Sequence, residues 1–285
     1  MIKMDKERFL SLFLEELKEN RALYPYYKLV DGSEGRRQFR QAYFMQRLAY
    51  LEKYIDFSSS PSILDCGCGF GTTGIFLAMN GCASRGTTLE YYADQIERRR
   101  QYWSQHGDVS LFEYAYENIF DTPPAPESYD YIILQDTLHH IEPVEKGLEI
   151  LCAALKPSGK LILIEENGGS WLKSMMLFMK RGNRRVVEVY DERLQKKILM
   201  GNENIRSEQQ WRQLFQKTGF VVDDASVQYI RLLPPCAYRS NLAETVIAKE
   251  QQMAQRHPFL KHHGCMGLNM VLGKNSKFKV QNSND

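Results

Sequence analysis

Two adjacent histidines, His139 and His140, follow the apolar run YDYIIL at 129–134. Imidazole is the side chain whose unperturbed pKa lies nearest neutrality, so either residue could remove a proton from a hydroxyl group. Ligands of α/β sheets bind beyond the carboxyl ends of the strands, where this pair is predicted to lie. A histidine after a strand can also serve only to satisfy backbone carbonyls, and that alternative stays open.

A glycine-rich segment, SILDCGCGFGTTGIFLAMN at 62–80, joins a short apolar run to a stretch with helical spacing. The run ends at Asp65, and three alternating glycines follow, at 67, 69 and 71. Glycines let a ligand approach the main chain more closely than a Cβ atom allows, and the next helix offers free N–H groups to an anion. Gly69, Gly71 and Gly74 also satisfy the dinucleotide fingerprint G-x-G-x-x-G, so a nicotinamide or flavin cofactor is considered too. A tight turn without a ligand is the remaining alternative.

Glu90 lies at the end of the next predicted strand, 85–89. In this topology such a carboxylate lies beside the first loop, where it can accept hydrogen bonds from both hydroxyls of a ribose. Because many cofactors contain a ribose, Glu90 supports the fold without choosing the ligand. It could also be an acid at a helix N-terminus, where negative charge is favoured.

Alternating strand-like and helical segments would position these residues. Apolar runs predict strands at 62–65, 85–89, 109–114, 129–134 and 159–165. Helices are predicted at 72–80, 92–105 and 144–155, with an irregular link at 116–127 and a Pro-Ser-Gly turn after Lys156. Further elements are predicted in the order helix, strand, helix, strand at 207–218, 220–232, 240–256 and 266–273. This alternation is typical of an α/β fold with a mostly parallel sheet and helices on both faces.

Two segments and the tail lie outside this alternation. Residues 1–57 carry amphipathic helices at 5–19 and 36–53, which either form a lid or simply pack on the core. Residues 168–205 hold a dense apolar group followed by Lys180, Arg181, Arg184 and Arg185, and are predicted to be a helical cap insertion in the central domain, 58–273. An oligomer interface, a partner interface or a covering helix are alternatives for the insertion. Residues 274–285 are polar and predicted to be disordered.

The order of these motifs resembles the class I S-adenosylmethionine (SAM) dependent methyltransferases, in their small-molecule and quinone-type branch. D-x-G-x-G-x-G from Asp65 is similar to motif I of that family, and Tyr129-Asp130 to the F-D of its fourth strand. The tail QDTLHHI at 135–141 is similar to the signature that follows this strand. The resemblance covers residues 60–273 and implies a Rossmann-like sheet of seven strands, with the last one antiparallel beside the fifth.

The resemblance also implies the cofactor, SAM, and the residues around it. The implied cofactor-binding residues are Asp65, Gly67, Cys68, Gly69, Gly71, Glu90, Tyr91, Asn118, Ile119 and Gln135. In this interpretation the glycine loop passes under the methionyl part of SAM, and Asn118 with Ile119 contacts the adenine. His139 would be a catalytic base oriented by Glu165, or by Glu166 if the strand register shifts by one. His140 would then be structural, or take the catalytic role itself.

Composition places broader limits on function. Lys and Arg total 37 against 35 for Asp and Glu, a formal net charge of +2, so no nucleic-acid partner is expected. The six cysteines include no C-x-x-C pair, so the sequence indicates neither a metal site nor a disulfide scaffold. The sequence contains no apolar run of about 18 residues, and its first residues lack a signal-peptide core. We therefore expect a cytoplasmic protein without a membrane span. The sequence leaves its oligomeric state open, with a homodimer as one alternative.

These motifs predict a SAM-dependent methyltransferase that acts on a small-molecule acceptor, at the oxygen of an aromatic or apolar hydroxyl compound. Such an enzyme must chiefly align the acceptor with the methyl group and exclude water. Three alternatives stay open: a C-methyltransferase of the quinone-biosynthesis type, an NAD-binding oxidoreductase, and a SAM-binding partner protein without catalytic activity.

Overall fold

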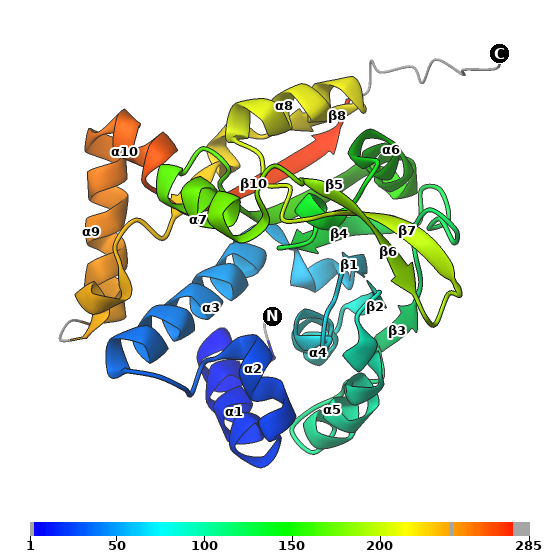
Figure 1. Ribbon diagram of the computed structural model, residues 1–285. Coiled ribbons are helices and arrows are strands. Elements are labelled where there is room, and N and C mark those ends of the chain that lie inside the picture. The colour runs from blue at the N-terminus through cyan, green and yellow to red at the C-terminus, as the bar shows by residue number, and fades with distance from the viewer. Residues whose placement is uncertain (1–2, 240–241, 276–285) are drawn as a thin grey trace.

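A computed structural model describes residues 3–239 and 242–275 of the chain, with a central sheet flanked by helices (Figure 1). Within these residues the sheet has eight strands in the order β3-β2-β1-β4-β5-β10-β8, and β9 also pairs with β10. The strands β1 to β5 run parallel, and β10 lies antiparallel between β5 and β8. Their bounds are β1 Ser62–Cys66, β2 Ala83–Thr88, β3 Phe112–Tyr116, β4 Tyr129–Gln135, β5 Leu155–Glu166, β8 Phe220–Val222, β9 Gln228–Ile230 and β10 Gly267–Lys274.

The predicted Rossmann-like plan, including its antiparallel last strand, is confirmed. The sheet has one strand more than the expected seven because the predicted strand 220–232 is divided into β8 and β9. A 3₁₀ turn at Asp224–Ser226 separates the two, and the hydroxyl of Ser226 accepts a hydrogen bond of 2.8 Å from the backbone N–H of Val271. A side chain thus replaces one link of the backbone ladder at this point.

The Pro-Ser-Gly turn expected after Lys156 was wrong. The helix predicted at 144–155 is α6 (Val144–Ala154), which ends one residue earlier, and β5 begins at Leu155. Tyr129 pairs with Leu155 and Tyr131 with Lys160, so the Pro-Ser-Gly segment is an irregularity within the strand. Pro157 accounts for the early end of the helix, because a residue before proline avoids the helical conformation.

Helices cover both faces of the sheet. Side chains of β4 alternate between two apolar clusters: Ile133 belongs to one, and Ile132 and Leu134 belong to the other. The cluster around Ile133 is built with α1 (Lys6–Glu19), α3 (Glu34–Tyr54), α4 (Thr72–Met79) and α5 (Gln95–Trp103). The opposite cluster includes α6, α8 (Glu208–Lys217) and part of α9 (Ala243–Arg256). The structure also contains α2 (Tyr24–Tyr27) and α10 (Pro258–His263), and no helix of the described residues is long and apolar enough to cross a membrane.

The insertion at 168–205 contains more than the expected helix. Helix α7 (Trp171–Arg181) is followed by an antiparallel hairpin of β6 (Val186–Asp191) and β7 (Lys196–Gly201). The β-branched residues of VVEVYD favour a strand over a helix, which the dense apolar group before them had concealed. Residues 276–285, within the predicted disordered tail, lie outside the described part of the chain, whereas Lys274 belongs to β10.

A buried ion pair attaches α1 to the glycine loop. Arg99 of α5 is fully buried and donates to both carboxylate oxygens of Glu16, at 2.8 and 2.7 Å. The same guanidinium donates to the carbonyl of Phe70 at 2.8 Å and to the hydroxyl of Thr72 at 2.6 Å. The indole N–H of Trp103 also donates to Glu16, at 2.8 Å. The N-terminal helix therefore helps to fix the loop between β1 and α4.

We expect Glu16→Ala to destabilise the protein by about 3–5 kcal/mol, because it leaves the Arg99 guanidinium buried without its counter-charge. The exposed neighbour Glu15 provides a matched control, and Glu15→Ala should change stability by less than about 0.5 kcal/mol. Urea unfolding followed by circular dichroism measures both. Equal stability of the two variants would show that α1 is not held by this pair.

Candidate active site

Two adjoining cavities lie beyond the carboxyl ends of β1, β2 and β4. The first, of about 400 Å³, lies between the ends of the strands and the β6–β7 hairpin. The second, of about 540 Å³, lies under α2 and α3. Both are lined by Tyr26, Gly67, Gln135, Asp136, Glu166 and Lys173. This is the edge of a parallel sheet at which ligands of α/β proteins bind.

The glycines after β1 have different roles. Gly69 has a positive φ of 54°, and a Cβ atom there would lie 2.8 Å from the hydroxyl of Tyr26, at the wall of both cavities. Gly67 also has a positive φ, and a Cβ atom would overlap Thr137 at 2.3 Å. Gly71 does not line either cavity, and a Cβ atom there would meet the ring of Phe112. Gly67 and Gly69 thus shape the cavity floor, whereas Gly71 serves packing.

Asp65, at the end of β1, lines the second cavity and is 2% exposed. Its Oδ2 atom is buried without a hydrogen-bond partner within the described residues. Burial raises the pKa of Asp65 to about 7, against the opposing effect of Arg47. A buried carboxylate oxygen without a partner is unfavourable unless a donor is supplied, so this site suits a cationic or N–H group of a ligand. Cys68 also lines the second cavity, but its thiol packs against Gly86.

The ends of β2 and β3 line the first cavity. Glu90 is exposed at its edge, just after β2. Asn118 is buried and lines the cavity with Ile119, and its Oδ1 accepts a hydrogen bond of 3.0 Å from the N–H of Phe120. That contact leaves the Nδ2 group of Asn118 as a donor. The side chain of Tyr91, another predicted residue, lies outside the described part of the structure.

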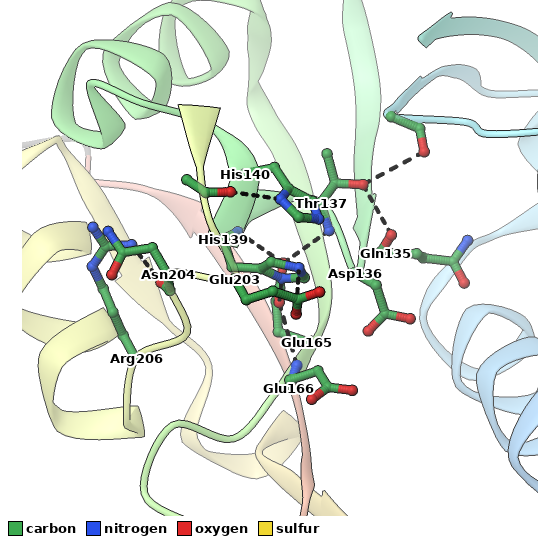
Figure 2. Close-up of polar contacts among 12 residues, drawn as sticks. Gln135, Asp136, Thr137, His139, His140, Glu165, Glu166, Glu203, Asn204 and Arg206 are labelled. Atoms are coloured by element: carbon green, nitrogen blue, oxygen red, sulfur yellow. Dashed lines mark hydrogen bonds and ion pairs between the residues drawn. The ribbon is translucent and has the colours of Figure 1, made fainter. Parts of the chain in front are cut away.

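His139 and Glu165 meet between the ends of β4 and β5 (Figure 2). Nδ1 of His139 lies 2.5 Å from Oε2 of Glu165, and both side chains are almost fully buried. The other oxygen of Glu165 accepts the backbone N–H groups of Thr137 and His139, at 3.0 and 3.3 Å. These contacts fix the carboxylate, which in turn orients the imidazole with Nε2 directed away from it. Nε2 lies 3.9 Å from Oε2 of Glu203, and His139 lines the first cavity.

The pKa of His139 reflects two opposing effects. Burial disfavours the imidazolium, but the carboxylates of Glu165, Asp136 and Glu203 outweigh burial and raise the pKa above its ordinary value. His140 instead contacts the hairpin, with Nδ1 2.8 Å from the carbonyl of Gly201. A Cβ atom at Gly201 would overlap the carbonyl of His139, which makes this close contact of β7 specific for glycine.

Arg47 of α3, which the motifs did not predict, contacts the strand residues that separate the cavities. It forms an ion pair with Asp136 at 3.0 Å and donates to Oε1 of Gln135 at 3.1 Å. The amide of Gln135 in turn donates to the hydroxyl of Thr73 at 2.6 Å. Burial opposes ionisation of Asp136, but Arg47 and other cations hold its pKa below the usual range. In the sequence, Arg47 is one of several cations in an amphipathic helix, and nothing local distinguishes it from the others.

A second charged group, also missed by sequence analysis, lines the cavity under α3. Glu166 contacts Lys173 of α7 and Arg231, which follows β9 and has a positive φ of 63°. The guanidinium of Arg231 lies 4.3 Å from the ring centre of Tyr43, whose buried hydroxyl has no partner in the described residues. Glu165 is therefore the acid that contacts His139, and Glu166 takes part in a separate ion-pair group. These residues come from three distant parts of the chain, which are α3, the junction of β5 with α7, and the segment after β9, so they leave no local motif.

The β6–β7 hairpin covers the first cavity. Ile198, Leu199 and Met200 of β7 line it, and Met200 forms an isolated bridge with Ile141. Side chains hold the hairpin to the strand ends: Asp191 accepts from the hydroxyl of Tyr116 at 2.8 Å, and Lys196 pairs with Asp121. At the end of the insertion, Asn204 and Arg206 donate to Glu142. The hairpin thus forms one wall of the first cavity.

The predicted site residues are divided between the two cavities. The predicted residues Gly67, Gly69, Glu90, Asn118, Ile119, Gln135, His139 and His140 all line the first cavity, Asp65 and Cys68 line the second, and Glu165 lies behind His139. The described residues contain no cluster of metal-ligating side chains, and all six cysteines are free thiols. The site therefore offers two adjoining cavities with polar and apolar walls and an imidazole that is oriented for proton transfer.

Comparison with known proteins identifies the family of this chain. The family model described as "Methyltransferase domain" matches residues 36–225. A ubiquinone biosynthesis O-methyltransferase of Idiomarina loihiensis is 30% identical over 129 residues, which are 44% of this chain and 51% of that protein. The chain spans only 31 to 51% of the length of the curated relatives that it matches.

Solved structures share the fold at low identity. A putative sarcosine dimethylglycine methyltransferase from Galdieria sulphuraria has a TM-score of 0.57 at 17% identity, covering 93% of this chain and 99% of that one. Phosphoethanolamine N-methyltransferase 2 of Haemonchus contortus, solved in complex with SAM, has a TM-score of 0.54 at 17% identity, covering 89% and 59%. With its sheet order, its glycine loop and the match of its central residues, this chain belongs to the methyltransferase domain family and has the fold of the SAM-dependent methyltransferases.

Proposed function

We propose that the protein is a SAM-dependent methyltransferase that transfers a methyl group to a hydroxyl oxygen of a small molecule with an aromatic or apolar part. The contact that supports oxygen as the acceptor is the one between His139 and Glu165, which orients an imidazole at the cavity wall. SAM supplies the activated methyl group, so the protein's own residues need only hold the two reactants, exclude water and take up a proton.

The first cavity and the glycine loop suit SAM. Glu90 would accept from the ribose hydroxyls, and Asn118 with Ile119 would contact the adenine, since all three line one cavity. The unpartnered Oδ2 of Asp65 would accept from the α-ammonium group of the methionyl part. Gly69 leaves the floor of the groove open, because a Cβ atom there would occupy space beside Tyr26.

The methionyl part of SAM would extend from the first cavity into the second at Asp65, and the acceptor would occupy the rest of the second cavity. Its hydroxyl would lie where the two cavities join, beside Asp136 and within reach of His139.

Aromatic side chains of α2 and α3, among them Tyr26, Phe39, Tyr43 and Phe44, form much of the wall of the second cavity. The hydroxyl of Tyr43 and Nε of Arg231 are buried there without partners in the described residues, so both could bind polar groups of the acceptor. An aromatic compound with one or more oxygen substituents combines these requirements.

Proton removal would proceed through His139. Its neutral imidazole, with Nδ1–H held by Glu165, presents Nε2 as the base for the acceptor hydroxyl. Glu165 stabilises the imidazolium that forms, which is consistent with the raised pKa of His139. A carbon acceptor, as in the quinone-type alternative, would depend much less on this base.

Binding of the cofactor product S-adenosylhomocysteine should release a proton near pH 6. Free Asp65 has a pKa of about 7 and is mostly protonated at that pH, whereas a bound ammonium group would lower its pKa. Isothermal titration in buffers of different ionisation enthalpy measures the proton count. Asp65→Asn should bind without proton release, and proton uptake by the parent protein would show that Asp65 does not face a cation. Absence of any binding, together with binding of NADH, would favour the oxidoreductase alternative.

We expect His139→Gln to lower kcat by about 10² to 10⁴-fold with an oxygen acceptor. The activity of the parent protein should fall on the acid side, because protonation of His139 removes the base. Glu165→Gln removes the largest effect that raises this pKa, so the acid limb should move to lower pH. pH profiles of kcat/KM for parent and variants test both statements, with His106→Gln, at a residue that follows α5 and lines neither cavity, as the control. Full turnover of His139→Gln would instead support carbon methylation.

Incubation of fractionated cell extract with radiolabelled SAM identifies the acceptor directly. We expect a labelled small molecule whose methyl group is released by ether cleavage, since the bond formed is to oxygen. A protein that binds S-adenosylhomocysteine but labels no metabolite in any fraction would be a SAM-binding partner protein rather than an enzyme.

A further inference from the structure

Helix α7 of the insertion exposes its apolar side chains, whereas a helix that packs on a protein core buries them. Six large apolar side chains are between 51 and 71% exposed, and only Leu177 is buried. The exposed residues are Trp171, Leu172, Met175, Met176, Phe178 and Met179. A contiguous apolar surface of this kind, which we call the α7 apolar face, marks a contact site rather than ordinary surface.

These residues lie on one side of the helix. With 3.6 residues per turn, the six apolar side chains fall within an arc of about 160°. Lys180 borders one side of that arc and Arg181 borders the other, whereas Lys173 reaches inward to Glu166. An apolar arc flanked by cations is the pattern of a helix that lies in the plane of a membrane surface, with its apolar side in the acyl region.

Neighbouring elements extend the same surface. The ring of Trp171 lies 5.1 Å from that of Phe259 on α10, and Phe259 is itself 56% exposed. Beyond the other end of α7, Arg184 and Arg185 are exposed before β6. In Figure 1 the helix lies on the outside of the molecule, between α10 and the hairpin. The α7 apolar face is therefore continuous with an aromatic group at one end and a cationic group at the other.

Charge favours a lipid surface over a second copy of the chain. In a two-fold symmetric dimer the same patch meets itself, so a partner molecule would bring the same cations, including Lys180, Arg184 and Arg185, to the interface. Anionic lipid headgroups would instead neutralise these charges, while the acyl region accepts the apolar side chains.

The helix also lies beside the active site. Lys173 lines both cavities and pairs with Glu166, so a membrane in contact with α7 would lie close to the cavities. An apolar acceptor could then enter from the bilayer without crossing water. This point rests on the proposed function, whereas membrane binding itself does not.

We propose that the α7 apolar face, with the cations that border it, binds the protein to the surface of an anionic lipid bilayer. Association is reversible and peripheral, because an 11-residue helix lying in the interface buries only one side.

Vesicle binding tests the proposal directly. We expect the protein to co-sediment with vesicles of phosphatidylcholine and phosphatidylglycerol, and much less with phosphatidylcholine alone. Trp171 provides a built-in reporter, since it is 63% exposed while Trp103 and Trp211 are fully buried. Its emission should shift to shorter wavelength with the anionic vesicles, and Trp171→Phe should lose that shift.

Variants separate the two contributions to binding. Met176→Glu with Met179→Glu should weaken binding about tenfold or more, because two apolar anchors become charged. Replacing Lys180, Arg184 and Arg185 by Gln should weaken it about fivefold for each charge lost. Val221→Glu, at a residue 52% exposed on β8, and Lys217→Gln on α8 are the matched controls and should bind like the parent.

Calorimetry with S-adenosylhomocysteine shows that each variant retains its fold, and it keeps this test independent of the proposed activity. The proposal is overturned if the parent protein fails to bind the anionic vesicles, or if the variants of α7 bind as tightly as the controls. A dimer that Met176→Glu with Met179→Glu converts to a monomer, without vesicle binding by the parent, would assign the face to a second copy of the chain.

Discussion

The parallel pairing of β1, β4 and β5 brings the polar residues of the site to one edge of the sheet. Asp65 pairs with Ile133, and Gln135 pairs with Ile164, so the carboxyl ends of the three strands are in register. The apolar side chains of these strands alternate between two clusters, so a slip of one residue would turn them to the wrong face. The position of Glu165 behind His139 is thus a consequence of core packing as much as of local sequence.

Charges in the interior are balanced by residues from outside the central sheet. Arg47 of α3 pairs with Asp136, Arg99 pairs with Glu16 of α1, and Lys173 of α7 pairs with Glu166. Buried ions of this kind are unfavourable without a partner. The N-terminal helices and the insertion are therefore part of the site, because they supply the counter-charges. Asp65 differs, since no ion pair is formed by it within the described residues and its Oδ2 is buried without a hydrogen-bond partner there, and this is where we propose that a ligand binds.

The insertion has two functions in this interpretation. Its hairpin forms a wall of the first cavity and is held there by contacts such as that of Tyr116 with Asp191. Its helix turns an apolar face outward while Lys173 reaches inward. One segment can therefore connect the proposed site of methyl transfer with the surface from which an apolar acceptor would arrive.

The sequence by itself determined the order of strands and helices, the glycine loop at Asp65 and the type of fold, because hydrophobic periodicity and glycine positions are local properties. It placed His139 and Glu165 at strand ends, from which a shared edge follows once the strands are parallel. It mistook the Pro-Ser-Gly segment for a turn, because that segment belongs to a strand that pairs with the distant β4. It missed the hairpin of β6 and β7, whose strands pair with each other, because the apolar group before them favoured a helix. Only the tertiary structure decided which cations meet which carboxylates, as with Arg47 and Arg231, since those contacts join segments far apart in the chain and leave no periodic signal.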